Sequence, residues 1–274
     1  MSKSNSPIGV FDSGVGGLTV LRTLREQLPY ESFIYLGDTA RLPYGTKGET
    51  TITRYATQAT QFLIDHSVKM VVIACNTASA LALAQLHIQF PDLPILGVIH
   101  AGAFAATQMT KTGSVLVIAT EGTTNNRAYE KAIHALNPDI RVFSQACSLF
   151  VALAEEGWLS GPLVERIISE YLTPLLKNIE DADTLVLGCT HFPTLRQAIQ
   201  RVVGHTLQLV DASEMTAHAV KDELFKRALF HSEMIEGRIE FLATDSPERF
   251  ARVAAHFMGH PLEVSDVKLV DLSG

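Results

Sequence analysis

The sequence predicts an α/β protein made of two similar lobes, each with a mostly parallel sheet flanked by helices. Short runs rich in Val, Ile and Leu recur along the 274 residues, and amphipathic patterns lie between them. The runs are almost continuously apolar, which is typical of strands that are buried on both faces of a parallel sheet. This alternation of strand and helix favours the α/β class.

Ten segments are expected to form strands, and most are followed by a helical pattern. The clearest helix covers 18–28, where leucines recur every three or four residues until Pro29 stops it. Ligands of parallel sheets bind at the carboxyl ends of strands, so those ends are where functional residues are expected. The expected strands are 8–11, 33–36, 70–74, 95–99, 115–119, 140–143, 185–187, 207–210, 239–242 and 267–270.

Composition narrows the classes of function. The net charge is −7 and no basic block is present, which argues against nucleic acid or an anionic membrane as the main partner. No apolar stretch approaches the ~18 residues of a membrane span, and no apolar core of a secretion signal is visible. The three cysteines do not make a disulfide framework, so we expect a cytoplasmic protein with reduced thiols.

Four strand ends carry unusual residues, and they form two matched pairs. A strand followed by a turn opens each pair, at Asp12 and at Thr120, and a strand ending in cysteine closes each, at Cys75 and at Cys189. The segments 70–77 and 184–191 share one design, in which an apolar strand leads through a small residue to cysteine and then to hydroxyl side chains. The pairing predicts two duplicated lobes that present one thiol each.

The two matched cysteines are candidates for chemistry, whereas Cys147 fits simple packing in a core. Cys75 and Cys189 each precede an expected helix, where backbone N–H groups and the helix dipole should lower the pKa of a thiol. A disulfide redox pair, a zinc site that uses Cys189 and His191, and a single Cys–His nucleophile each fit less well. Two thiols suit proton transfer on opposite faces of one carbon, which inverts a stereocentre.

Nearby polar residues have competing interpretations. Asp12 either assists this chemistry or caps the following helix, and His191 either acts as an acid/base or lies at the surface. The glycine loop 12–19 partly matches a dinucleotide fingerprint, with Asp38 as the later acid, but Thr19 replaces the third glycine. An anion site remains open for that loop. The segment 38–45 is either an ordinary turn or a loop that lines a ligand site.

Four motifs taken together resemble glutamate racemase, a family of cofactor-independent enzymes that supply D-glutamate for bacterial peptidoglycan. They are Asp12-Ser-Gly-Val-Gly-Gly, Asp38-Thr-Ala-Arg-Leu-Pro-Tyr-Gly, Ala74-Cys-Asn-Thr-Ala-Ser and Leu187-Gly-Cys-Thr-His-Phe-Pro. The resemblance extends over nearly the whole chain. It implies an active site between two α/β lobes, L- and D-glutamate as ligands, no cofactor or metal, and commonly a homodimer.

The resemblance also implies roles for individual residues. Cys75 would act as the base on the D-enantiomer and Cys189 on the L-enantiomer, with Asp12 and His191 as auxiliary acid/base groups and Glu155 as an acidic helper near the second thiol. Asp12 and His191 would also contact substrate. The other substrate contacts that it implies are Ser13, Tyr44, Gly45, Asn76, Thr77, Thr120, Thr123 and Thr190.

Three positions depart from the family's usual residues: Ser148 stands where Pro is frequent, Phe192 where Tyr is frequent, and His100 where Glu or Pro is common. The first two changes concern the lobe hinge or local packing rather than the reaction.

The lobes are expected to be discontinuous in sequence. Residues 1–98 and 211–274 would form the first lobe, on the side of Cys75, and 99–210 the second. Three other functions stay open: racemisation of aspartate or a related amino acid, a nucleotide-dependent oxidoreductase that uses the glycine loop, and an amino-acid binding protein without catalysis.

Overall fold

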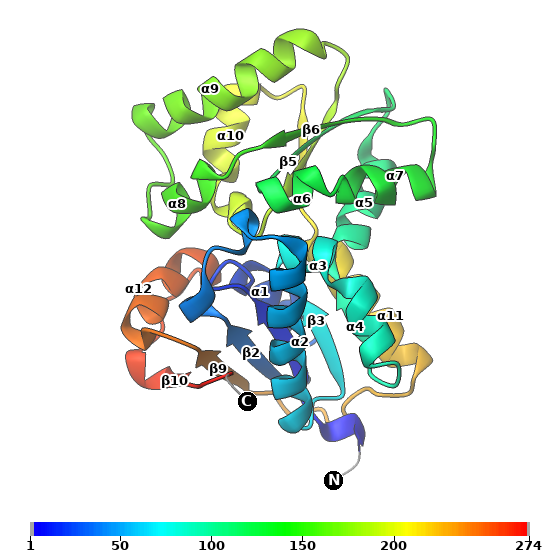
Figure 1. The fold of residues 1–274 in the computed structure, drawn as a ribbon, viewed down its shortest axis with the longest axis vertical. Coiled ribbons are helices and arrows are strands. Elements are labelled where there is room, and N and C mark those ends of the chain that lie inside the picture. Colours follow the sequence, from blue (N-terminus) through cyan, green and yellow to red (C-terminus); the bar gives the residue numbers. More distant parts are fainter. Residues whose placement is uncertain (1–2, 273–274) are drawn as a thin grey trace.

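The computed structural model describes residues 3–272 and contains two parallel sheets, one above the other in Figure 1. The larger sheet has the strand order β10-β9-β2-β1-β3-β4, and the smaller has β6-β5-β7-β8. Every paired strand runs parallel to its neighbour. The two-lobed α/β prediction is therefore confirmed.

All ten expected strands are present, with ends that shift by up to three residues. The central strands are buried along their whole length, which explains their continuous apolarity. The strands are β1 Ile8–Asp12, β2 Phe33–Gly37, β3 Met70–Ile73, β4 Ile95–Gly97, β5 Ser114–Ala119, β6 Arg141–Ala146, β7 Thr184–Gly188, β8 Gln208–Val210, β9 Ile239–Ala243 and β10 Val267–Leu269.

Helices cover both faces of each sheet, and each face has its own apolar core. The expected helix at 18–28 is confirmed as α1. The helices are α1 Leu18–Gln27, α2 Glu49–Asp65, α3 Asn76–Leu81, α4 Leu83–Gln89, α5 Val98–Met109, α6 Glu121–Asn125, α7 Ala128–Leu136, α8 Leu149–Glu155, α9 Pro162–Asn178, α10 Arg196–Val203, α11 Ser213–Lys226 and α12 Pro247–Met258.

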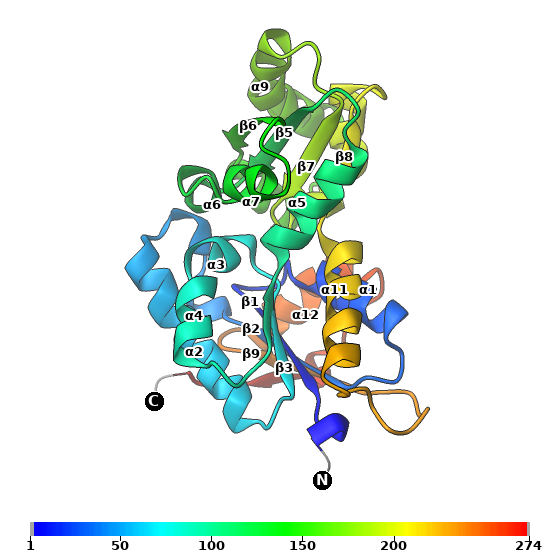
Figure 2. The ribbon, with the colours of Figure 1, turned by 90° about the vertical axis from the view of Figure 1, so that its right-hand side faces the viewer.

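The two sheets repeat the same topology. The order β2-β1-β3-β4 in the larger sheet corresponds strand for strand to β6-β5-β7-β8 in the smaller. Under this correspondence β1 matches β5 and β3 matches β7, as the two pairs of strand-end motifs predict. Figure 2 shows α5 and α11 where the two lobes meet, and these helices pack against each other.

Two local expectations were wrong. Val98 and Ile99 begin α5 instead of ending a strand, because β4 is a short edge strand that ends at Gly97. The segment after Cys189 starts not as an α-helix but as the 3-10 helix Phe192–Leu195, with Pro193 inside it.

The larger sheet draws on residues 8–97 and 239–269, and the smaller on 114–210. The lobe boundaries at 98/99 and 210/211 stay a prediction, and residues 1–2 and 273–274 of that division lie outside the described residues. Within residues 3–272, no helix combines the length and apolarity needed to span a membrane.

Candidate active site

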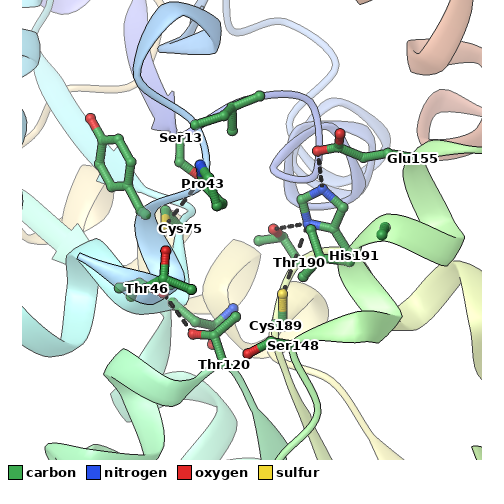
Figure 3. Close-up of a pocket in the computed structure, with 17 residues that line it drawn as sticks. Ser13, Pro43, Thr46, Cys75, Thr120, Ser148, Glu155, Cys189, Thr190 and His191 are labelled. Atoms are coloured by element: carbon green, nitrogen blue, oxygen red, sulfur yellow. Dashed lines mark hydrogen bonds and ion pairs between the residues drawn. The ribbon is translucent and has the colours of Figure 1, made fainter.

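A cavity of about 270 Å³ lies where the carboxyl ends of the two sheets face each other, and both lobes line it (Figure 3). Strands β3 and β7 each have neighbours on both sides, so their carboxyl ends lie inside their sheets. Cys75 follows β3 and Cys189 follows β7, and both thiols line this one cavity. Both are free and buried, at 5% and 7% exposed.

Cys75 is the N-terminal cap of α3. Its Sγ accepts a hydrogen bond from the backbone N–H of Ala78 at 3.5 Å, and it is hydrogen-bonded to Ser13 Oγ at 3.6 Å. Burial, with the charge of Asp12, nevertheless raises the pKa of the Cys75 thiol to about 12, and the two hydrogen bonds only moderate the rise. The expectation that the helix start would lower this pKa was wrong. The desolvation of a fully buried thiol outweighs the helix terminus.

Cys189 is part of a chain of three side chains. His191 Nδ1 lies 3.8 Å from Cys189 Sγ, and His191 Nε2 lies 3.1 Å from Glu155 Oε1. The imidazole is 3% exposed, so the interpretation of His191 as a surface residue was wrong. The ring therefore joins a thiol on one side to a carboxylate on the other, which suits transfer or storage of a proton.

His191 and Glu155 form a pair in which the imidazole is positively charged and the carboxylate negatively charged. Burial opposes an imidazolium, but the hydrogen bonds and charges of Cys189 and Glu155 outweigh it and raise the pKa of His191 to about 10. Burial would also raise the pKa of Glu155, yet His191 and Arg249 hold it below its usual value. Arg249, on α12, donates to Glu155 Oε2 at 3.0 Å and so links the C-terminal helix to the second lobe.

Replacing Glu155 by Gln is expected to lower the pKa of His191, because the neutral amide no longer stabilises the imidazolium. In the native protein the raised pKa stabilises the fold below pH ~6.5, the ordinary pKa of histidine, and this contribution is lost as the pH rises through about 10. In Glu155→Gln this stability is lost at a lower pH than in the native protein. If the rate requires the imidazolium, the fall in rate on the alkaline side of the pH profile also moves to lower pH. NMR titration of the His191 ring measures the shift directly.

Glu156→Gln is the matched control, since the Glu156 side chain is 63% exposed and its ion-pair contact is with Arg249 at 3.8 Å. An equal shift of the His191 titration in both variants would contradict the assignment to Glu155.

Hydrogen bonds between side chains hold the polar wall of the cavity in place. Thr77 Oγ1 and Thr120 Oγ1 meet at 2.9 Å across the lobes. The hydroxyl of Tyr129 donates to Asn76 Oδ1 at 2.7 Å, which leaves the amide N–H₂ of Asn76 for a ligand. The hydroxyl of Tyr44 donates to a carboxylate oxygen of Asp38 at 2.5 Å.

The glycine loop permits close approach between the lobes. A Cβ on Gly16 would lie 2.5 Å from His191 Nδ1, and one on Gly17 would lie 2.6 Å from Asp12 Cβ. Thr19 Oγ1, in place of the third glycine of a dinucleotide fingerprint, donates to the carbonyl oxygen of Thr190 at 3.3 Å. The loop thus packs against the motif of the second thiol, and the interpretation of the loop as an anion site stays a prediction.

Asp12 does not cap the following helix, whose N-terminal cap is Gly17. Its Oδ2 accepts the N–H of Gly14 at 2.9 Å, while Oδ1 is buried without a partner. Burial raises the pKa of Asp12, and the charge of His191 opposes the rise. Asp12 therefore lies behind the cavity wall, where its charge acts on Cys75.

Most of the predicted site residues line the cavity together. Asp12 and Thr123 do not; Thr123 Oγ1 instead lies 3.4 Å from Thr120 Oγ1 and supports that hydroxyl. The residues that line the cavity as predicted are Ser13, Tyr44, Gly45, Cys75, Asn76, Thr77, Thr120, Glu155, Cys189, Thr190 and His191.

The segment 38–45 lies at the cavity, because Leu42 and Pro43 form part of the wall with Tyr44 and Gly45, and its contact with a ligand stays a prediction. The wall residues that were not assigned to the site are Leu42, Pro43, Thr46, Ser148, Val151 and Ala152. Among residues 3–272, no group of three or more His, Cys, Asp or Glu side chains is arranged to hold a metal ion.

This architecture matches a known family. The chain belongs to the Asp/Glu/Hydantoin racemase family, whose model matches residues 8–220. Within that family its full-length relatives include the glutamate racemase of Syntrophus aciditrophicus, which is 49% identical over 93% of this chain and 94% of its own length.

Solved structures agree. A glutamate racemase from Francisella tularensis in complex with D-glutamate is 39% identical and superposes with a TM-score of 0.89 over 98% of this chain and 99% of that one. An isoform from Bacillus anthracis is 37% identical, with a TM-score of 0.92 and 98% coverage of both chains. An aspartate racemase from Picrophilus torridus, at 14% identity and a TM-score of 0.52, shares the fold alone.

Proposed function

We propose that this protein is a glutamate racemase that interconverts L- and D-glutamate by a two-thiol mechanism without a cofactor. The observation that carries the proposal is the pair of buried thiols, which come from equivalent strand ends of two repeated sheets and line one cavity. The substrate is supported by the glutamate racemases to which the chain is similar over nearly its whole length, one of them in complex with D-glutamate.

In this mechanism one sulfur acts as a thiolate and takes the Cα proton, and the electron pair of the C–H bond stays on the substrate carbon. The other sulfur, as a thiol, gives its proton to the opposite face of that carbon. The product has inverted configuration, and the thiol and thiolate have exchanged places. Cys75 would remove the proton from D-glutamate and Cys189 from L-glutamate.

The thiol is far more acidic than the Cα–H bond, so the site must stabilise the carbanion. Each pKa unit of mismatch costs about 1.4 kcal/mol. We assign binding of the substrate carboxylates to the hydroxyl, amide and backbone N–H groups of the wall: those of Ser13, Tyr44, Gly45, Asn76, Thr77, Thr120, Thr190 and His191. Thr123 acts through Thr120.

The auxiliary groups have different parts in the proposal. The raised pKa of Cys75 favours the thiol form, which can donate a proton. The ammonium group of an entering substrate would offset the negative charge of Asp12 and ease ionisation of Cys75. His191, oriented by Glu155, would exchange a proton with Cys189.

We further propose a cytoplasmic homodimer that supplies D-glutamate for peptidoglycan synthesis. The acidic composition and the three free cysteines support this location. Light scattering on the purified chain tests the dimer.

Incubation of D-glutamate in D₂O tests the racemase itself. Pure protein that is free of metal and pyridoxal should place deuterium at Cα while it forms L-glutamate. Racemisation without deuterium incorporation, or no turnover at all, would refute proton transfer by thiols. Rates for aspartate, measured beside those for glutamate, separate the two substrates, and a faster rate for aspartate would overturn the assignment to glutamate.

A further inference from the structure

Ser148 contributes a buried hydroxyl without a partner to the active-site cavity. It lies on the side of the second lobe, and Figure 3 shows its hydroxyl between Thr120 and Cys189. Six buried side-chain atoms in residues 3–272 have no hydrogen-bond partner, and Ser148 Oγ is the one that belongs to a residue lining this cavity. Burying a hydroxyl without a partner costs free energy, so such a group in a cavity wall points to a ligand.

The local backbone explains why this hydroxyl is free. Ser148 is the N-terminal cap of α8, where a serine normally accepts a hydrogen bond from a backbone N–H of the first turn. Its φ of −61° and ψ of −28° are helical rather than extended, and its side chain makes no capping hydrogen bond. The residue therefore does not use its hydroxyl to stabilise its own helix.

The two polar groups that Figure 3 draws on either side of this hydroxyl have partners within the protein. Thr120 Oγ1 contacts Thr77 and Thr123, and Cys189 Sγ contacts His191. A glutamate in the cavity would bring two carboxylates, which are strong acceptors of hydrogen bonds. A free O–H donor beside these engaged groups is complementary to a carboxylate oxygen.

We propose that Ser148 is a substrate-binding residue whose hydroxyl donates to a carboxylate oxygen of glutamate. This inference rests on the proposed function for the identity of the ligand. It assigns a contact to a position where the resemblance to glutamate racemases implies none. Ser148 takes no part in proton transfer to or from either thiol, so it contributes to substrate binding.

Ser148→Ala tests the proposal. Loss of a hydrogen bond to a charged group should raise KM for both enantiomers, and the Kd for D-glutamate, by about tenfold. The turnover number should change by less than about threefold. Ser148→Thr keeps the donor and should restore KM to within a few-fold of the native value.

Ser114→Ala is the matched control. Ser114 Oγ is also buried without a partner, but it lies in β5 and does not line the cavity. It should leave KM unchanged while it reports the effect on Tm of deleting such a hydroxyl. A KM and Kd unchanged within twofold in Ser148→Ala would overturn the inference, as would an equal rise in Ser114→Ala.

The Kd for D-glutamate is measured by calorimetry with Cys189→Ala and with the double variant Cys189→Ala, Ser148→Ala, because racemisation would otherwise change the ligand during the titration. Failure of the racemase proposal would appear as native protein that does not exchange the Cα proton in D₂O. Failure of the Ser148 proposal would instead appear as native and Ser148→Ala proteins that bind and racemise glutamate alike.

Discussion

Replacing either Cys75 or Cys189 by Ala is expected to reduce racemisation in both directions by about 10²–10⁴-fold or more, because each direction needs one sulfur as base and the other as acid. A site with one thiol can remove a proton from a single face but cannot deliver one to the other. The fold should survive, since each change deletes one sulfur atom at the cavity wall. Polarimetry or a coupled assay on both enantiomers measures the loss.

Cys147→Ala is the matched control. Cys147 is fully buried and its thiol pKa is raised to about 12 by burial, but it belongs to the apolar core of the second lobe and does not line the cavity. It should cost about 1 kcal/mol of stability and leave the rate nearly unchanged. Substantial racemisation by Cys75→Ala or Cys189→Ala, or equal losses in all three variants, would refute the two-thiol assignment.

The position of both thiols could be predicted because it depends only on where a continuously apolar strand ends. An apolar run that ends in cysteine before polar residues places that cysteine at the carboxyl end of a parallel strand, whichever helix follows. The expected strand 95–99 was wrong at Val98 and Ile99, but this did not affect the positions of the thiols because that strand lies at the edge of its sheet. The correspondence of β3 with β7 also follows from the sequence, because the repeat preserves the strand-end residues.

The sequence could not show which polar side chains reach the cavity. Asp12 and Thr123 belong to the right motifs, yet neither lines the cavity. Arg249 contacts Glu155 from 94 residues further along the chain, and no local pattern encodes that contact. The predicted direction of the Cys75 pKa shift was wrong for a related reason. The sequence shows the start of a helix, but it does not show how deeply the thiol is buried.

A second large effect is expected from Gly16→Ala. Gly16 does not have a positive φ, so the added methyl group introduces no backbone strain. The Cβ would instead clash most closely with Thr190 Oγ1 and would lie 2.5 Å from His191 Nδ1, so these two side chains or the second lobe must move. A displacement of about 1 Å in a catalytic group can cost 10²-fold in rate, and overpacking costs about 1–3 kcal/mol of stability.

We therefore expect Gly16→Ala to reduce kcat/KM by about 10²-fold and to lower Tm. Gly48→Ala is the control, because a Cβ on Gly48 meets no atom within 4 Å and its φ is −71°. Full activity in Gly16→Ala would mean that the lobes can move apart to accommodate the methyl group without a loss of rate. The contact between Gly16 and His191 would then not fix the distance between the two halves of the site. A loss confined to Gly16→Ala would show that this glycine is required because Thr190 and His191 of the other lobe pack directly against its Cα.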